Sequence, residues 1–258
     1  MPLLRLQRVL TGDIPGRSGR TLLPSVPGQN QECPPLKGMS FAHNPQATFP
    51  RKGIFVTFEG IEGSGKTTQI RRLSTHLAAK GVLHLVTREP GGTPLSDEIR
   101  ALVLVPREET VFPEAELLLY EAARAQHVRG LILPALLSGR AVLCDRFCDA
   151  TTAYQAHARG LDAPQVDRLN RFAAGGLVPV LTLLFDLPPE EGFARIKGRG
   201  YASDRLERES LDFHRAVRKG YLRLAGRDPG RVVRIDGAAP EEEVFRSVLR
   251  AVAQRFGW

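Results

Sequence analysis

The sequence predicts an α/β fold in which a five-stranded parallel sheet is covered by helices on both faces. From residue 53 onward, five short apolar runs alternate with longer stretches whose apolar residues have helical spacing. Such alternation is typical of parallel strands joined by crossover helices. A glycine-rich turn also separates the first apolar run from the first helical stretch, at the edge of the sheet where folds of this class bind ligands.

Each apolar run has the length of a strand and is bounded by glycine, proline or charged residues. The expected strands are Ile54–Phe58, Val82–Thr87, Ala141–Cys144, Val180–Phe185 and Val232–Ile235. Among the helical stretches, the first stops at Gly81, and Thr93-Pro94 has the residues of a helix start. The expected helices are Thr68–Lys80, Pro94–Leu104, Pro113–Leu137, Asp149–Ala158, Ala163–Ala174, Pro189–Lys197, Arg205–Ala225 and Pro240–Arg255.

The turn after the first strand matches G-x-x-x-x-G-K-[ST], in which backbone N–H groups surround the phosphates of a nucleotide. A strand before it and a helix after it are the context that this motif requires. The sequence therefore predicts a P-loop NTPase fold, with Lys66 bridging the β- and γ-phosphates and the Thr67 hydroxyl ligating Mg²⁺. The residues expected to bind the triphosphate are Gly60, Ile61, Glu62, Gly63, Ser64, Gly65, Lys66, Thr67 and Thr68.

The net charge of +8 is compatible with two kinds of partner, nucleic acids and small molecules that carry several phosphates. Residues 1–52 contain seven Lys and Arg but only two acidic residues, so most of the excess lies before the first strand. The rest of the chain has no long basic stripe with interleaved aromatic residues, which disfavours nucleic-acid binding.

The apolar content is that of a soluble protein, and no apolar run approaches the ~20 residues that a membrane-spanning helix needs. The three cysteines are too few for a disulfide framework, which indicates a reducing compartment and favours a cytoplasmic location. Cys144 and Cys148 have no histidine or further cysteine nearby to complete a metal site, so we interpret them as buried thiols.

Residues 1–52 are rich in Pro, Gly, Ser, Gln and Arg and have no apolar period, so we expect a disordered extension. The segment is Arg-rich and acid-poor, as transit peptides are, but its prolines argue against an amphipathic helix. A start at Met39 would leave a chain of ordinary size, and the first 38 residues could then be an annotation artefact. Residues 53–258 are expected to form the α/β domain.

Further polar groups follow the predicted strands. Asp145 ends the third strand, where a Walker-B-type carboxylate would help to hold Mg²⁺, and Arg146 beside it could make a forked contact with a second phosphoryl group. The alternative for this pair is a salt-bridged loop. The loop 88–93 after the second strand has Pro90 and two glycines, so its backbone can pass close to a ligand, and Arg100 lies in the helix that follows.

Two sets of helical residues could contact a nucleotide base. Tyr120 and Arg124 are four apart and share a helix face, where the ring could stack on a base and the guanidinium could donate to a carbonyl. Without further context, a core tyrosine beside a surface arginine is the simpler interpretation. Thr151, Tyr154 and Gln155 begin the helix after Asp145, and the amide of a glutamine can bond to both donors and acceptors of a base.

Residues 195–205 form a basic, glycine-containing segment between two helices. Phosphoryl transfer requires positive charge near the migrating group and exclusion of water, and a short lid that carries arginines supplies both. A solvated run of charges is the alternative. We expect a lid, because basicity and flexibility coincide here.

Together these residues resemble the thymidylate kinase family of nucleoside monophosphate kinases, over about residues 53–256. The marks occur in family order, and the loop 87–93 together with the Asp-Arg and Ala-Tyr-Gln motifs is specific to the family, whereas the phosphate loop alone is not. They are residues 58–69 (FEGIEGSGKTTQ), 87–93 (TREPGGT), 122–127 (AARAQH), 145–147 (DRF), 153–155 (AYQ) and 204–207 (DRLE).

The resemblance implies transfer of the γ-phosphoryl group from ATP to dTMP, giving dTDP and ADP in dTTP biosynthesis, with Mg²⁺ at Thr67 and Asp145. The residues expected to bind dTMP are Glu62, Pro90, Arg100, Tyr120, Arg124, Arg146, Thr151, Tyr154 and Gln155. Of these, Glu62 would contact the 3′-hydroxyl region of the sugar, and Arg100 and Arg146 would hold the phosphate. Tyr120 occupies the position of the family's stacking aromatic residue, and Tyr154 would lie near the 2′ position of the sugar.

The resemblance also implies where the catalytic charge comes from. Eukaryotic-type members place an arginine inside the phosphate loop, whereas this loop has Ser64 there. The sequence is therefore similar to bacterial-type members, and the catalytic residues expected are Lys66, Asp145 and the lid arginines Arg199 and Arg195. The family is usually homodimeric, and residues 117–119 and 131–133 are apolar enough to supply an interface.

Three rival functions remain at this point. One is a kinase that acts on a different nucleoside monophosphate or on a deoxynucleoside, and another is an ATP-dependent nucleic-acid-binding protein, which the net charge suggests. The third is a GTP-dependent switch protein, but each of the three asparagines is followed by a residue other than lysine, so the Asn-Lys-x-Asp guanine motif is absent. None of the three accounts for the loop 87–93.

Overall fold

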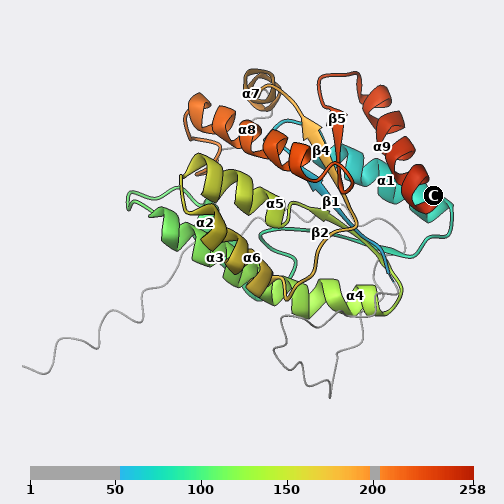
Figure 1. Ribbon diagram of the computed structural model, residues 1–258, viewed down its shortest axis with the longest axis horizontal. Helices are drawn as coiled ribbons and strands as arrows, with labels where there is room; N and C mark the ends of the chain where they lie inside the picture. Colours follow the sequence, from blue (N-terminus) through green and yellow to red (C-terminus); the bar gives the residue numbers. More distant parts are fainter. Residues whose placement is uncertain (1–52, 198–203) are drawn as a thin grey trace, which may run out of the picture. The chain divides into compact units, whose positions relative to one another are not determined.

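The computed structural model describes residues 53–197 and 204–258, so the expected extension 1–52 and the lid arginine Arg199 lie outside the described residues. The described chain contains a five-stranded, wholly parallel sheet in the order β2-β3-β1-β4-β5 (Figure 1), which confirms the predicted fold class. Its strands are β1 Phe55–Glu59, β2 His84–Arg88, β3 Ala141–Asp145, β4 Leu181–Asp186 and β5 Val232–Asp236.

The carboxyl end of every strand lies one residue later than predicted. Each strand ends on a charged side chain, and these are Glu59, Arg88, Asp145, Asp186 and Asp236. The apolar pattern stops before these residues, but the parallel ladder continues through them, because backbone hydrogen bonds do not depend on the side chain. The sheet therefore presents a row of charges at one edge.

Alternation along the strands divides the core into two layers. Val56 and Phe58 of β1 pack with helix α1 (Lys66–Ala79) and helix α9 (Glu241–Phe256) on one face. Phe55 points to the opposite face, where residues of the helical segment 128–137 cover it. Figure 1 shows α1 and α9 side by side on one side of the sheet and α4, α5 and α8 on the other.

The predicted helix Pro113–Leu137 is one helical rod with a wide turn in its middle. It consists of α3 (Pro113–His127), the π-helical η1 (Val128–Ile132) and α4 (Leu133–Leu137). Pro134 has no N–H to donate to the preceding turn, and in η1 the N–H of Leu133 donates to the carbonyl of Val128. The predicted helix Asp149–Ala158 is likewise α5 (Cys148–Thr151) followed by the π-helical η2 (Thr152–Ala158).

Helix α8 (Leu211–Arg227) begins six residues later than the predicted start at Arg205. The Ser210 hydroxyl accepts from the Phe213 N–H and caps α8, and residues 205–208 form a turn. The expected helix Arg205–Ala225 was therefore wrong at its beginning. The remaining helices lie close to their predicted positions and are α2 (Pro94–Leu104), α6 (Ala163–Ala173) and α7 (Pro189–Lys197).

The two apolar segments expected at a dimer interface differ in exposure. Leu118 is 57% exposed, whereas Leu117 is buried. In the second segment Ile132 and Leu133 are both buried in the core and Leu131 is partly buried, so little of this segment lies at the surface. Among the described residues, no helix is long and apolar enough to cross a membrane, and none of their acidic, histidine and cysteine side chains gather in threes as a metal site.

Candidate active site

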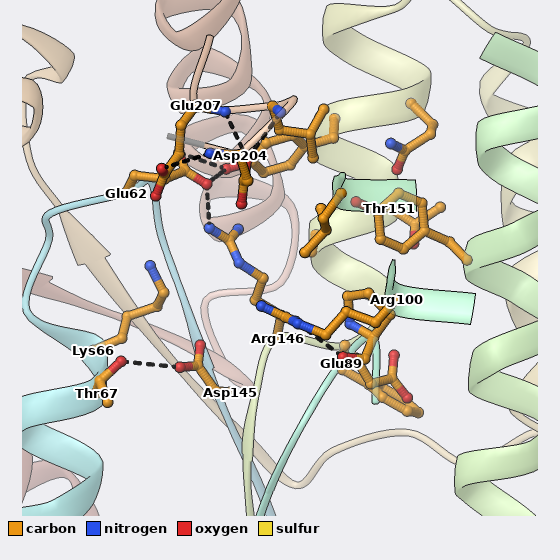
Figure 2. Close-up of a pocket in the computed structure, with 18 of the residues that line it drawn as sticks. Glu62, Lys66, Thr67, Glu89, Arg100, Asp145, Arg146, Thr151, Asp204 and Glu207 are labelled. Carbon is orange, nitrogen blue, oxygen red and sulfur yellow. Dashed lines mark hydrogen bonds and ion pairs between the residues drawn. The ribbon is translucent and has the colours of Figure 1, made fainter. Parts of the chain in front are cut away.

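Beyond the carboxyl edge of the sheet lies a cavity of about 250 Å³, which is lined by Asp145 at the end of β3 and by residues of the loops that follow β1 and β2. Figure 2 shows Lys66, Thr67 and Asp145 on one side of this cavity and Arg100, Glu89 and Thr151 on the other, with Arg146 between them. The cavity thus has two ends, one at the phosphate loop and one at helices α2, α3 and η2.

Most of the predicted site residues line this cavity. They are Glu62, Gly63, Lys66, Thr67, Pro90, Arg100, Tyr120, Arg124, Asp145, Arg146, Thr151, Tyr154 and Gln155. The predicted residues Gly60, Ile61, Ser64, Gly65 and Thr68 belong to the same loop and the start of α1 but do not line it, and Arg195 does not line it either.

Lys66 is folded into its own phosphate loop. Its ammonium group donates to the carbonyls of Gly60 and Ile61 at 2.9 and 2.7 Å and to the Ser64 hydroxyl at 3.3 Å. Burial, together with the nearby charge of Arg146, lowers the pKa of Lys66 to about 8. The loop therefore holds a lysine whose charge is poorly compensated until an anion arrives.

Thr67 and Asp145 meet across the cavity edge, with the Thr67 hydroxyl donating to Asp145 Oδ2 at 3.3 Å. The two side chains come from the first turn of α1 and the last residue of β3. A hydroxyl and a carboxylate are hard oxygen donors of the kind that Mg²⁺ prefers, and such sites use few protein ligands besides substrate phosphates and water. The donor set fits magnesium.

The phosphate loop packs directly on helix α7. A Cβ atom at Gly192 of α7 would lie 2.5 Å from the carbonyl oxygen of Glu62, and one at Gly63 would lie 2.2 Å from the carbonyl of Gly192. Arg195, one turn further along α7, donates to the carbonyls of Gly237 at 2.8 Å and Gly63 at 3.5 Å. Arg195 therefore lies against the loop backbone and does not reach into the cavity.

Arg146 is the non-glycine residue with a positive φ, 71°, among those the structure describes, and its side chain crosses the cavity. It donates to Glu62 Oε1 at 2.6 Å and to the Tyr221 hydroxyl at 3.3 Å, and its guanidinium lies 5.0 Å from the centre of the Tyr154 ring. The Tyr154 hydroxyl also donates to Glu62, at 2.8 Å. Burial opposes ionisation of Glu62, but Arg146, His214 and Lys66 together outweigh it and lower the pKa of this carboxyl.

Glu59 is a fully buried carboxyl beneath the Asp-Arg-Phe loop. It accepts the N–H of Phe147 at 2.7 Å and the hydroxyl of Tyr221 at 2.8 Å. Burial, reinforced by the charge of Asp149, raises the pKa of Glu59 to about 8. Because Phe147 directly follows Arg146, this carboxyl holds the loop in the conformation that directs Arg146 across the cavity.

Arg124 is 2% exposed, so the interpretation of a surface arginine beside a core tyrosine was wrong. Its guanidinium donates to Glu89, Glu121, Asn170 and Thr151 at distances of 2.7 to 2.9 Å. These bonds occupy four of its five N–H groups, and the side chain still lines the cavity. The remaining N–H, on Nη2, is available to a ligand.

Two other predicted residues sit at the far end of the cavity. Arg100 donates to the carbonyl of Pro90 at 3.0 Å, across the cis peptide bond of the loop 88–93. Tyr120 is partly buried beside Val103, in a small apolar cluster of α2 and α3. Burial raises the pKa of its hydroxyl, so Tyr120 stays neutral at physiological pH.

Several cavity residues were not among the predicted site residues. Asp204 and Glu207 form a turn in which Asp204 Oδ1 accepts the N–H groups of Leu206 and Glu207, both at 2.9 Å. Glu89 lines the cavity and accepts from Arg124. Their only signal in the sequence was an acidic residue inside a motif, which does not distinguish a supporting carboxylate from a contacting one.

Known proteins that are similar to this chain share one family. The family model for thymidylate kinase matches residues 58–248. Thymidylate kinases of Citrifermentans bemidjiense and Syntrophotalea carbinolica are 51% and 53% identical to the chain, covering 79% and 76% of it and 92% and 93% of those proteins. A crystal structure of thymidylate kinase from Ehrlichia chaffeensis superimposes with a TM-score of 0.62 and 31% identity, covering 78% of this chain and 98% of that one.

Proposed function

The chain belongs to the thymidylate kinase family, and we propose that its cavity binds ATP and dTMP end to end, with Arg146 between the two phosphates. The reaction is transfer of the γ-phosphoryl group of ATP to dTMP, giving dTDP and ADP for dTTP synthesis. The single observation that carries the arrangement is the position of Arg146, which crosses the cavity between the phosphate loop and the buried Arg124 cluster.

The phosphate loop binds the donor nucleotide in this proposal. Backbone N–H groups of residues 60–68 surround the β-phosphate, and the Lys66 ammonium exchanges the carbonyls of Gly60 and Ile61 for phosphate oxygens. Because that ammonium is buried and only weakly compensated, the incoming phosphates gain a strong charge interaction. Positioning and charge stabilisation account for most of the catalysis of phosphoryl transfer.

Magnesium fits the remaining oxygen donors at the loop. We propose that Thr67 and Asp145 hold a Mg²⁺ ion together with phosphate oxygens and water. When bound, the ion neutralises charge on the β- and γ-phosphates.

The acceptor nucleotide occupies the other end of the cavity. Arg146 and Arg100 hold the phosphate of dTMP. To do so, Arg146 either gives up its bond to Glu62 or bonds to Glu62 and the phosphate together. Glu62 and Tyr154 face the sugar, and Tyr120 stacks on the base. The free N–H of Arg124 and the hydroxyl of Thr151 contact base carbonyls. Pro90 and Gln155 complete the lining.

Catalytic charge is completed by the segment that follows α7. Arg195 supports the phosphate loop through Gly63 and Gly237 in this state, and a rearrangement of α7 would be needed to bring it to the migrating phosphoryl group. We therefore favour Arg199 as the transition-state cation. Replacement of Arg199 by alanine should reduce kcat with little change in the dTMP KM, and unchanged turnover would remove Arg199 from this role.

A substrate panel tests the proposed function. Phosphorylation rates for dTMP, dUMP, dCMP and dAMP are measured with ATP and Mg²⁺ by a coupled ADP assay. A donor for a base carbonyl at that end of the cavity favours the pyrimidines with an O4 carbonyl, dTMP and dUMP, over dCMP and dAMP, and membership of the family places dTMP first. A preference for another monophosphate would overturn the assignment.

We also propose the domain boundaries, the oligomeric state and the location of the protein. Residues 53–258 form the kinase domain, and 1–52 are an extension that the reaction does not require. The protein is a homodimer whose interface includes the exposed Leu118 of α3. A cytoplasmic location follows from the free thiols Cys144 and Cys148, which suit a reducing compartment. We expect small nucleotides to be its ligands, and neither nucleic acid nor membrane.

A further inference from the structure

The base end of the cavity contains a contact that the proposed roles do not use. Glu116 of α3 is completely buried, and its Oε1 accepts a hydrogen bond from the side-chain amide nitrogen of Gln155 at 2.8 Å. We propose that Glu116 is a specificity-determining positioning residue, which fixes the Gln155 amide so that its oxygen, and not its nitrogen, faces the base. This inference rests on the proposed function of the cavity.

The orientation of the Gln155 amide follows from the chemistry of Glu116. Arg159 donates to both oxygens of Glu116, from Nε to Oε1 at 3.3 Å and from Nη2 to Oε2 at 3.1 Å, and Arg205 donates to Oε2 at 2.5 Å. Burial opposes ionisation of this carboxyl, but the hydrogen bonds from Arg159, Gln155 and Arg205 outweigh it and lower its pKa. An ionised carboxylate only accepts hydrogen bonds, so the NH₂ group of Gln155 must face it.

The amide oxygen of Gln155 must then face away from Glu116. Gln155 is 2% exposed and lines the cavity, and among the residues that the structure describes no donor is bonded to its Oε1. The cavity therefore offers a ligand one acceptor, the amide oxygen of Gln155. It also offers one donor, the N–H on Arg124 Nη2 that makes none of the four internal hydrogen bonds of this guanidinium.

A donor and an acceptor at the same end of a cavity select a base that offers a carbonyl next to a ring N–H. Thymine has this pair in O4 and N3–H, whereas cytosine has an amino group and an unprotonated N3. A buried acceptor that faces another acceptor loses its hydrogen bond and is costly to leave unpaired. Discrimination thus depends on which way the Gln155 amide points, and Glu116 decides this.

The substitution Glu116→Gln tests the inference. An amide at position 116 keeps its oxygen in the place of Oε2, where the Nη2 groups of Arg159 and Arg205 donate, and has its nitrogen in the place of Oε1. This loses the 3.3 Å bond from Arg159 Nε and turns an NH₂ group toward Gln155, so Gln155 flips and presents its own NH₂ to the base. Arg159 retains its bond to Glu209 at 2.6 Å, and Arg205 its bond to the carbonyl of Val103 at 2.8 Å, so the variant should fold.

The measured quantity is the ratio of kcat/KM for dTMP to that for 5-methyl-dCMP, two substrates that share the methyl group and differ only at the base edge. We expect this ratio to fall by at least about tenfold in E116Q. Arg159→Met is the matched control, because it disturbs the same cluster but leaves the Glu116–Gln155 bond, and its ratio should stay within about twofold of the wild type.

The outcomes separate the two levels of the proposal. A wild-type enzyme without preference for dTMP would contradict the proposed function, and this inference with it. A wild-type preference that a folded E116Q protein retains unchanged would overturn the role of Glu116 alone. If E116Q does not fold, the cause would be the two guanidinium groups, of Arg159 and Arg205, that lose the charge of Glu116. The double variant E116Q/R159M removes one of these groups, and the ratio of kcat/KM for dTMP to that for 5-methyl-dCMP is then measured on it.

Discussion

At the scale of single residues, two buried ionisable groups titrate close to neutral pH. Lys66 in the phosphate loop and Glu59 beneath the Asp-Arg-Phe loop both have a pKa near 8, one lowered and the other raised by burial. Neither shift could be predicted from the sequence, because each depends on how much water the folded chain leaves around the group. Both have measurable consequences.

The affinity for ATP should decrease as the pH rises above 8. The empty protein loses the charge of Lys66 above that pH, whereas bound phosphates keep the ammonium protonated, so binding must then take up a proton. The dissociation constant of a non-hydrolysable ATP analogue should rise by up to about tenfold per pH unit between pH 8 and 10. Calorimetry at several pH values measures it.

Lys66→Arg is the control, since arginine remains charged throughout this range. The pH dependence of binding should become flatter in K66R, whatever its affinity at pH 7. If K66R and the wild type had the same slope, titration of Lys66 would not be the cause.

Replacement of Glu59 by glutamine should change how stability depends on pH. The folded-state pKa of Glu59, about 8, lies above the ordinary glutamate value of 4.5, so its protonated form stabilises the folded state fully below about pH 4.5. This contribution is lost as the pH rises through 8, with a slope of up to ~1.4 kcal/mol per pH unit between the two values. Glutamine can accept from Phe147 but does not titrate.

Urea unfolding of the wild type and E59Q between pH 5 and 9 provides the measurement. The difference in unfolding free energy between them should shift steadily in favour of E59Q as the pH rises, because all other titrating groups are common to both proteins. A constant difference would mean that Glu59 is already ionised in the folded state at pH 5.

At the scale of elements, the contact between α7 and the phosphate loop depends on two glycines. In Gly192→Ala the new Cβ would lie 2.5 Å from the carbonyl oxygen of Glu62, so the phosphate loop must move. Because this displaces a preorganised phosphate site, we expect ATP binding to weaken by at least about tenfold. Gly226→Ala in α8 is the control, since a Cβ there has no atom within 4 Å, and it should be neutral or slightly stabilising.

Binding of an ATP analogue and thermal unfolding are measured for both variants. The expected result is a folded G192A protein with impaired binding and a G226A protein with wild-type binding. Equal ATP affinity in G192A and the wild type would show that the loop adapts to the extra atom at no cost.

Element positions were largely predictable, and the errors have physical causes. Strand ends came one residue short because a charged side chain ends the apolar pattern without ending the ladder. Pro134 did signal a break in the long helix, since a proline inside a helix cannot donate its hydrogen bond. The late start of α8 had a signal in Ser210, a favourable N-cap, which the helical spacing of the preceding residues obscured.

At the scale of the whole molecule, the proposed dimer predicts a response at one exposed side chain. Leu118→Asp should weaken dimerisation by at least about tenfold, because it places a charge in a desolvated interface. Leu83→Asp is the control, since Leu83 is 71% exposed and precedes β2, away from α3. Sedimentation velocity over a range of concentrations compares the two variants, and a wild-type monomer would contradict the dimer itself.

The proposed domain boundary predicts that a protein of residues 53–258 is a complete enzyme. Its kcat and its midpoint of thermal unfolding should match those of the full chain, with kcat within about twofold, because the sheet and its two helical layers lie within these residues. Loss of activity on truncation would show that the reaction needs the segment 1–52.

The sequence by itself determined the fold class, the phosphate loop and most of the residues that line the cavity, because these depend on local motifs and on the periodicity of apolar residues. Tertiary structure decided which of the polar residues contact a ligand and which support them. Nothing in the sequence around Arg124, Glu116 and Glu59 distinguishes them from charged residues at the surface. In the structure each is buried and bonded to partners from distant segments. Burial and pairing of charges arise only when those segments meet, and they set the pKa values and the orientation of the donors in the site.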